Sequence, residues 1–270
     1  MRKILLSLFS MALATSAMMA QESVVTAGKW QVTANETTGK VTIVYGDETI
    51  VSGNEAEWGL RDAKKTFASL TDIAVSHNDY QDEFGSGKQL IVSGKTTNSP
   101  ITTITHTYYI YSDRDYILTD VVLESNEQLE INYIAPIRST GSANILDAGT
   151  NYFLYVPFDN DGWTRYETRK FGEHHPTCYE VSVFFNNDSR RGLVTGSIEH
   201  DTWKTGVSSG TTGETTLKWL TVFNGVTSKG GTRDNDPHGA VKARRVESSK
   251  MMIGYFTDWR RGMETYADLC

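Results

Sequence analysis

The sequence predicts an all-β fold, a large antiparallel sandwich of two sheets followed by a short C-terminal helix. Segments of alternating apolar and polar residues, separated by glycine-containing turns, succeed one another along most of the 270 residues. These segments show no repeat period, and no long helical pattern interrupts them before the C-terminal region. Many short strands without intervening helices favour an antiparallel sandwich over a parallel sheet.

The first twenty residues have the organisation of a secretory signal peptide. Arg2 and Lys3 form a charged region, and residues 4–14 form an apolar stretch that is too short to span a bilayer. Small residues follow, and cleavage is expected after Ala17 or Ala20. No cysteine lies near this junction, so a lipid-anchored start is not indicated. We therefore expect an exported chain, in a periplasm or outside the cell.

Period-two segments account for the first half of the mature chain. Strands are predicted at 29–34, 40–45, 49–51, 57–61, 73–76, 89–93, 101–111, 116–124 and 130–137. Residues 64–70 fit a helical turn or a strand equally well. The segment 77–88 contains glycines and a lysine, but Asp82 and Gln89 stand where a phosphate-binding loop requires glycine and Ser or Thr. We therefore expect a glycine-rich hairpin loop at 77–88.

The second half of the chain continues with strands separated by polar loops. Strands are predicted at 152–156, 181–185, 192–198, 216–223 and 250–256, and loops at 208–213 and 228–236. The predicted domains are a signal peptide at 1–20, the sandwich at 21–255, and a linker with a helix at 256–270.

The helix is predicted from four apolar residues at helical spacing, Trp259, Met263, Tyr266 and Leu269. Asp258 precedes them and is a good N-cap residue. The apolar face of this helix needs a partner. Either the sandwich supplies it, or a continuation of the chain does.

The charge balance is acidic and argues against several classes of partner. The chain has 26 Lys and Arg against 33 Asp and Glu, a formal net charge of −7. An acidic chain without a basic cluster is not expected to bind nucleic acid or an anionic membrane. The pairs Arg190-Arg191 and Arg244-Arg245 are isolated, so we expect them at ion-paired or solvated surface positions.

Metal ligands and paired cysteines are few. His174 and His175 are adjacent and would point to opposite faces of a strand. Residues 234–236, Asp-Asn-Asp, offer oxygen ligands for calcium but lack the glycine and glutamate of a helix–loop–helix calcium site, so a turn is preferred. No metal or cofactor is therefore expected. Cys178 and Cys270 could pair after export, and the sequence does not show whether they meet.

No residue has a convincing catalytic setting. Ser197 lies within a predicted strand and lacks the Gly-x-Ser-x-Gly turn of a serine nucleophile. Glu199 and Asp201 share a strand face and could approach the spacing of a glycosidase carboxylate pair. However, Arg190-Arg191 and Lys204 are ready ion-pair partners for them. We therefore assign no catalytic residue.

Residues 152–206 are rich in the side chains that bind sugars. Aromatic rings pack on the apolar face of a pyranose, and carboxylates and amides bind its hydroxyls. The strongest candidate is the loop Asp159-Asn160-Asp161-Gly162-Trp163, which follows a strand ended by Pro157. The alternative is an acidic surface turn with Trp163 folded onto the core.

Three runs of residues form a recognisable set: 153–163 (FLYVPFDNDGW), 187–204 (NDSRRGLVTGSIEHDTWK) and 258–267 (DWRRGMETYA). Together they resemble secreted α-galactosidase-like glycoside hydrolases, the melibiase and raffinose-synthase clan. The resemblance covers most of residues 21–270 and corresponds to the family's N-terminal region, where a large β-sandwich precedes a (β/α)₈ barrel. It implies retaining hydrolysis of α-linked galactosides by two aspartates on barrel strands. Neither those aspartates nor the Trp-Asn-Ser-Trp-like strand that opens the barrel is found in this sequence.

The expected function is therefore that of a non-catalytic N-terminal sandwich that helps to shape the sugar site and is inactive alone. Its expected partners are an α-galactoside-type oligosaccharide and the missing catalytic barrel. The substrate-binding residues matched to the family's sandwich loop are Asp159, Asn160, Asp161 and Trp163, with His200, Asp201 and Trp203 second. Two alternatives are a stand-alone carbohydrate-binding protein and a structural or oligomerisation domain without a ligand.

Overall fold

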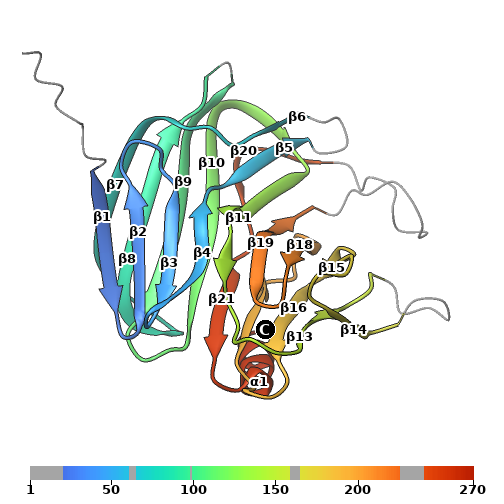
Figure 1. Ribbon diagram of the computed structural model, residues 1–270. Helices are drawn as coiled ribbons and strands as arrows, with labels where there is room; N and C mark the ends of the chain where they lie inside the picture. The colour runs from blue at the N-terminus through green and yellow to red at the C-terminus, as the bar shows by residue number, and fades with distance from the viewer. Residues whose placement is uncertain (1–20, 61–64, 98, 159–164, 226–239) are drawn as a thin grey trace, which may run out of the picture.

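The computed structural model describes residues 21–60, 65–97, 99–158, 165–225 and 240–270. Within these ranges, the strands form two large antiparallel sheets, and a helix lies at one end of them (Figure 1). The all-β, two-sheet sandwich predicted from the alternating segments is therefore confirmed.

The first sheet begins at the N-terminal end of the described chain. Its order is β1 (Glu22–Ala27), β2 (Trp30–Asn35), β3 (Val41–Tyr45), β4 (Glu48–Asn54), β11 (Tyr133–Gly141), β19 (Thr216–Asn224), β18 (Thr205–Thr212) and β15 (Cys178–Tyr179). At its side, β5 (Glu57–Leu60) pairs with β11, β6 (Lys65–Phe67) with β5, and β12 (Ala143–Asn144) with β19. The undecided segment 64–70 thus contributes a short strand.

The second sheet contains the longest strands. Its order is β14 (Glu167–Lys170), β13 (Asn151–Tyr155), β16 (Val181–Asn186), β17 (Gly192–Ser197), β21 (Met251–Phe256), β10 (Tyr116–Ile131), β9 (Ile101–Tyr111), β8 (Gly85–Lys95) and β7 (Thr71–Asp82). β20 (Val241–Glu247) pairs with the far part of β10. Strands distant in the sequence, such as β17 and β21, therefore lie side by side.

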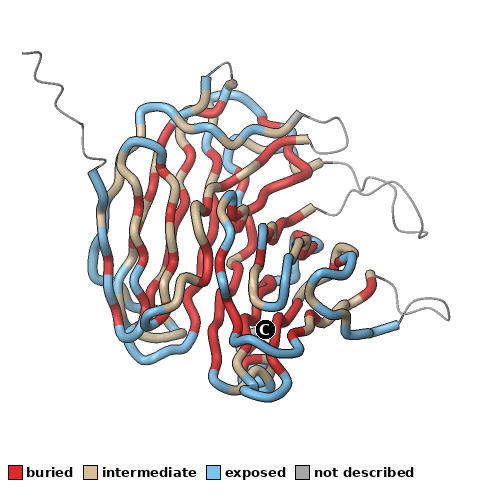
Figure 2. The backbone as a smooth tube through the Cα atoms, viewed as in Figure 1, coloured by how far each residue is buried: buried red, intermediate tan, exposed pale blue. Residues whose placement is uncertain are grey.

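The main core contains buried residues of both sheets, and Figure 2 shows buried positions along the strands of each. In β3, Val41, Ile43 and Tyr45 are buried and alternate with half-buried residues. They belong to the same apolar cluster as Leu90 and Tyr108 of the opposite sheet. Each such side chain contributes about 1.5–3 kcal/mol when it is removed from water, so this alternation stabilises the sandwich.

Two segments predicted as loops are largely strands. The glycine-rich hairpin predicted at 77–88 is confirmed, but its loop is shorter than expected, because most of these residues belong to the paired strands β7 and β8. Its polar residues suit a strand because β7 is at a sheet edge, where side chains can face water. The loop predicted at 208–213 was wrong. Residues 208–212 belong to β18. The glycines of this strand make room for rings on β19: a Cβ at Gly206 would lie 2.3 Å from the ring of Phe223.

The predicted C-terminal helix is α1 (Trp259–Leu269), and the sandwich supplies its partner. The Asp258 side chain accepts a hydrogen bond from the Arg260 amide at 3.1 Å, as an N-cap should. The apolar face packs on the second sheet, with Tyr266 buried and the Trp259 ring 4.5 Å from the Phe185 ring. The Tyr266 hydroxyl also donates to the carbonyl of Ser197 at 2.6 Å. The helix is thus an integral part of this fold.

Other expectations from the sequence meet the structure only in part. Residues 1–20 lie outside the described residues, so the signal peptide stays a prediction. No helix among the described residues has both the length and the apolar character needed to cross a membrane. Cys178, which is buried, and Cys270, which is exposed, are both free thiols rather than a disulfide.

Candidate functional site

Three segments enclose a groove of about 500 Å³ at one end of the sandwich. They are the loop 198–203 between β17 and β18, the turn 247–249 between β20 and β21, and the residue that follows α1. The lining residues are Ile198, Glu199, His200, Asp201, Thr202, Trp203, Glu247, Ser248, Ser249 and Cys270. The second group of sequence-predicted sugar-binding residues, His200, Asp201 and Trp203, is therefore gathered in one groove.

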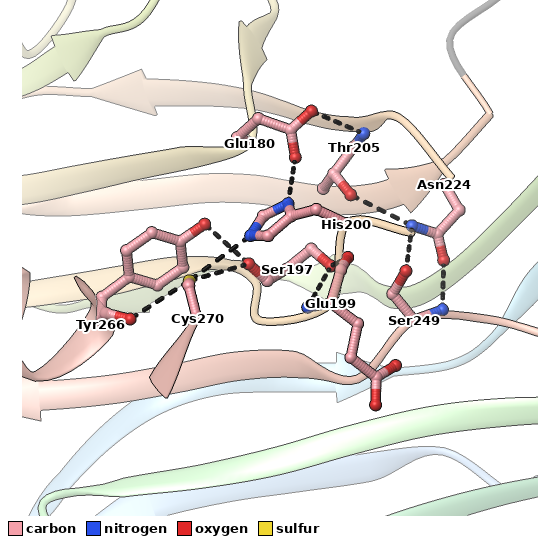
Figure 3. Close-up of polar contacts among 9 residues, drawn as sticks. All are labelled: Glu180, Ser197, Glu199, His200, Thr205, Asn224, Ser249, Tyr266 and Cys270. Carbon is pink, nitrogen blue, oxygen red and sulfur yellow. Dashed lines mark hydrogen bonds and ion pairs between the residues drawn. The ribbon is translucent and has the colours of Figure 1, made fainter. Parts of the chain in front are cut away.

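His200 makes two side-chain contacts that join separate elements (Figure 3). Its Nδ1 lies 3.0 Å from Oε2 of Glu180, and its Nε2 lies 3.4 Å from Sγ of Cys270. A carboxylate only accepts hydrogen bonds, so Nδ1 carries the hydrogen and Nε2 is left with a lone pair facing the sulfur. The imidazole is thus oriented by Glu180 and remains partly exposed in the groove.

Glu180 is fixed by the backbone on both sides. It joins β15 to β16 with a φ of 66°, a left-handed conformation that is costly for a residue other than glycine. Its amide donates to the Thr205 carbonyl at 3.0 Å, and its carbonyl accepts from the Ser197 amide at 3.1 Å. The Thr205 amide also donates to its Oε1 at 3.4 Å. These contacts hold the side chain next to His200.

A buried amide supports the turn that forms the opposite wall. Asn224 donates to the hydroxyls of Thr205 at 3.1 Å and Ser249 at 3.3 Å. Its Oδ1 accepts a hydrogen bond from the Ser249 amide at 2.7 Å. Because all three groups are buried, this network fixes the position of the turn relative to β18 and β19.

Trp203 serves mainly as an anchor of the loop. Only 9% of the residue is exposed, and its Nε1 donates to the Glu247 carbonyl at 2.8 Å. Its ring packs with Trp58 and other members of a second apolar cluster. Trp203 therefore offers the groove little exposed surface.

The two carboxylates of the loop differ in their surroundings. Oε2 of Glu199 accepts a hydrogen bond from the Lys250 amide at 2.8 Å, while Asp201 is exposed at the groove. The expected ion pairs with arginine and lysine were wrong. Arg191 instead pairs with Glu48 at 2.7 Å, and Lys204 lies over the ring of Phe158 at 4.3 Å. Asp201 is thus available to a ligand hydroxyl.

Asp120 is an unusual carboxyl near the groove that the sequence analysis did not select. It is buried on β10 and accepts a hydrogen bond from the Tyr109 hydroxyl at 2.8 Å. Burial raises its pKa to about 6, with smaller upward contributions from Glu247 and Glu199 and downward ones from Tyr109 and Lys250. An aspartate in the middle of an apolar strand was the signal that could have identified it.

The strongest sugar-binding candidates from the sequence, Asp159, Asn160, Asp161 and Trp163, lie outside the described residues and stay predictions. So does the possible calcium loop at 234–236. The preceding residue, Phe158, is described: its ring lies 4.9 Å from that of Tyr179 and close to Lys204. Phe158, the residue before the acidic segment, therefore lies beside the strand that leads to Glu180.

The adjacent histidines have separate environments. His175 is buried, its ring stacks on Phe153 at 3.7 Å, and its Nδ1 lies 2.9 Å from the Ser209 hydroxyl. Burial lowers its pKa to about 4, which keeps it neutral at pH 7. His174 is exposed. In the described part of the chain, His, Cys, Asp and Glu side chains do not gather in groups of three that could hold a metal ion.

Comparison with known proteins finds similarity in structure only. No protein-family model matches the chain. No curated protein matches its sequence. Solved structures of glycoside hydrolases do match, and their identity to this chain is low enough that the likeness concerns the fold.

Three of these structures illustrate the match. A glycoside hydrolase family 97 enzyme from Pseudoalteromonas sp. strain K8, in complex with panose, has a TM-score of 0.56 at 11% identity over 87% of this chain and 36% of its own. A family 36 α-galactosidase from Geobacillus stearothermophilus has a TM-score of 0.52 at 8% identity, covering 92% and 41%. An α-N-acetylgalactosaminidase from Bifidobacterium bifidum, in complex with GalNAc, has 0.51 at 10%, covering 87% and 35%. This chain thus spans well under half the length of each protein.

Proposed function

We propose that this chain is the non-catalytic, N-terminal β-sandwich portion of an exported α-galactosidase-like glycoside hydrolase, and that its groove contributes to the sugar site. The observation that carries the proposal is the groove at 198–203, in a fold that resembles part of glycoside hydrolases. It combines carboxylate, imidazole and hydroxyl groups that can bind sugar hydroxyls.

The geometry supports binding better than hydrolysis. Glycosidases hold two carboxyl groups on either side of the scissile bond. In the groove, Glu199 is engaged by a backbone amide, whereas Asp201 is exposed. This asymmetry leaves one carboxylate for a sugar hydroxyl. The catalytic aspartates are proposed to belong to a barrel, as the resemblance of residues 153–163, 187–204 and 258–267 to the α-galactosidase clan implies.

The preference for α-galactosides rests on two kinds of support. The first is that same resemblance in sequence. The second is that the structural neighbours include an α-galactosidase and an α-N-acetylgalactosaminidase. Export is proposed from the charged and apolar organisation of residues 1–20.

The test is calorimetric titration of the mature chain with melibiose and raffinose, together with an assay for hydrolysis of nitrophenyl α-galactoside. We expect saturable binding without turnover, and a loss of about tenfold to a hundredfold in affinity for Asp201→Ala, since one hydrogen bond to a charged group is removed. Asp79→Ala, at an exposed position on β7, is the matched control and should bind as the unmodified chain does.

Two results would contradict the proposal. One is a flat titration of protein that circular dichroism shows to be folded, since the groove would then make no contribution of its own. The other is hydrolysis that disappears in Glu199→Gln, because the chain would then carry its own catalytic carboxyl.

A second function, stand-alone carbohydrate binding, is favoured by one observation away from the groove. Trp219 on β19 is 41% exposed, and its indole lies against Gly210, where a Cβ would be 2.3 Å from Nε1. An exposed indole on a strand is a platform for a sugar ring. If this function holds, Trp219→Ala abolishes binding and Asp201→Ala does not.

A further inference from the structure

The groove contains a thiol whose surroundings are unrelated to sugar binding. Cys270 is exposed and lines the groove next to His200. Its thiol hydrogen has three acceptors within reach, Nε2 of His200 at 3.4 Å, the Tyr266 carbonyl at 3.2 Å and the Ser197 carbonyl at 3.9 Å. A sulfur, an imidazole and a carboxylate thus follow one another in a chain of contacts (Figure 3).

This order of groups is the one that activates a nucleophile. A base within reach of the thiol takes its proton, and a third group fixes the tautomer and orientation of the base. Glu180 fulfils the third role, because it accepts the Nδ1 hydrogen and leaves the Nε2 lone pair directed at sulfur. The left-handed backbone of Glu180 is held by contacts to Thr205 and Ser197, so the carboxylate is positioned before any ligand arrives.

We propose that Cys270 is a reactive thiol, with His200 as its base and Glu180 as the positioning residue, and that it forms mixed disulfides with low-molecular-weight disulfides. His200 takes the thiol proton, and the Cys270 thiolate attacks one sulfur of the small disulfide. A new S–S bond forms as the original S–S bond breaks. The leaving thiolate then takes the proton from His200, so the exchange needs no further oxidant.

The groups that face the thiol explain why the base is required. Burial and the negative charge of Glu180 raise the pKa of Cys270, while the hydrogen bond with Tyr266 lowers it. Glu199 and Asp201 of the loop and Glu247 of β20 line the same groove. In this acidic setting the thiolate is formed through His200. The rate of exchange at neutral pH should therefore depend on the presence of His200.

Cys178 provides an internal reference. It is buried, its thiol donates to the Leu154 carbonyl at 3.3 Å, and burial raises its pKa to about 11. In the folded chain it should remain unmodified while Cys270 reacts. Modification of both cysteines at similar rates would show that the protein is unfolded or that the groove confers no reactivity.

The experiment treats the folded chain with oxidised glutathione over a pH series from about 5 to about 9, and follows each cysteine by peptide mass spectrometry. We expect the Cys270 adduct to form at neutral pH while Cys178 stays unmodified. His200→Ala should slow the reaction at neutral pH about tenfold and move the midpoint of the pH profile upward, because the raised pKa of the thiol is then no longer offset by a base. Glu180→Gln should also slow the reaction, since the imidazole loses the carboxylate that orients it.

His77→Ala is the matched control, because His77 is exposed on β7, in a different part of the sequence and fold. Its rate and midpoint should equal those of the unmodified chain. The proposal is overturned if His200→Ala reacts with the same rate and midpoint as the unmodified chain, or if Cys270 in folded protein forms no adduct. A sugar-binding measurement on the same variants is independent of this outcome, so failure of one proposal does not imply failure of the other.

Discussion

The interior between the sheets and the groove at 198–203 are held together by different interactions. In the interior, large apolar side chains such as Trp30 and Ile43 are fully buried, and hydrophobic burial supplies most of the stability. Around the groove, loops are held by hydrogen bonds from buried polar groups such as Asn224. Between the sheets, substitutions that remove side-chain volume should lower the free energy of unfolding most. Around the groove, the loss of a single hydrogen-bonding atom should be enough to disturb the loops.

This difference predicts which substitutions change stability alone and which also change the groove. A change between the sheets should alter the free energy of unfolding without altering the shape of the groove. A change in the polar supports should alter both. The following predictions test that separation, from the largest expected effect to the smallest.

Replacing Trp30 with alanine should have the largest effect on stability. Its ring is fully buried 4.7 Å from that of Tyr45, and Nε1 donates to the Arg114 carbonyl at 3.0 Å. We expect a loss of about 3–5 kcal/mol in the free energy of unfolding, measured in urea. Trp219→Ala, at an exposed position, should change it by about 0.5 kcal/mol. Equal losses in the free energy of unfolding for the two variants would contradict the difference between the buried Trp30 and the exposed Trp219.

The buried carboxyl of Asp120 should make stability depend on pH. Its folded-state pKa of about 6 is above the ordinary unfolded value, so the folded chain binds more protons between these two values. The contribution of Asp120 to the free energy of unfolding is therefore complete below about pH 4. It is lost as the pH rises through about 6, by about 3 kcal/mol in total.

Asp120→Asn tests this dependence directly. It should remove the decline between about pH 4 and about pH 6 in urea unfolding. Asp79→Asn, at an exposed position, should keep the decline. Parallel pH profiles for Asp120→Asn and the unmodified chain would show that Asp120 is already ionised in this range.

Two buried asparagines allow the sharpest comparison. Asn54 lies between the sheets and donates to the Tyr108 hydroxyl at 2.8 Å, while Asn224 supports the groove. Each change to alanine should cost about 1–3 kcal/mol, since buried partners are left unsatisfied. Only Asn224→Ala should also weaken the binding of raffinose. Equal binding by the two variants would mean that the groove is not shaped by its polar support.

The strands could largely be predicted from the sequence because alternation reports directly which face is buried. The loop predicted at 208–213 was wrong because the glycines of β18 accommodate rings on β19. At 77–88 the hairpin was predicted, but its loop is shorter than expected because β7, at the sheet edge, carries polar residues. In both cases the position of the strand in its sheet decided the structure, and the local sequence does not show that position.

Less of the candidate site than of the strands could be predicted from the sequence. His200, Asp201 and Trp203 were selected and line one groove, and Trp203 also anchors the loop through the Glu247 carbonyl. Glu180 and Cys270 were not selected as ligands or bases. They are 20 and 70 residues away from His200 in the chain, and pairing of β15 with β18 and packing of α1 bring them together.

The most direct test of the proposed function is nuclear magnetic resonance mapping of raffinose on the isotopically labelled chain. We predict that the amide shifts caused by the sugar concentrate at residues 198–203 and 247–249, and that they require a correspondingly higher raffinose concentration in Asp201→Ala. Shifts that concentrate around Trp219 instead, or the absence of shifts in folded protein, would contradict a sugar site in this groove.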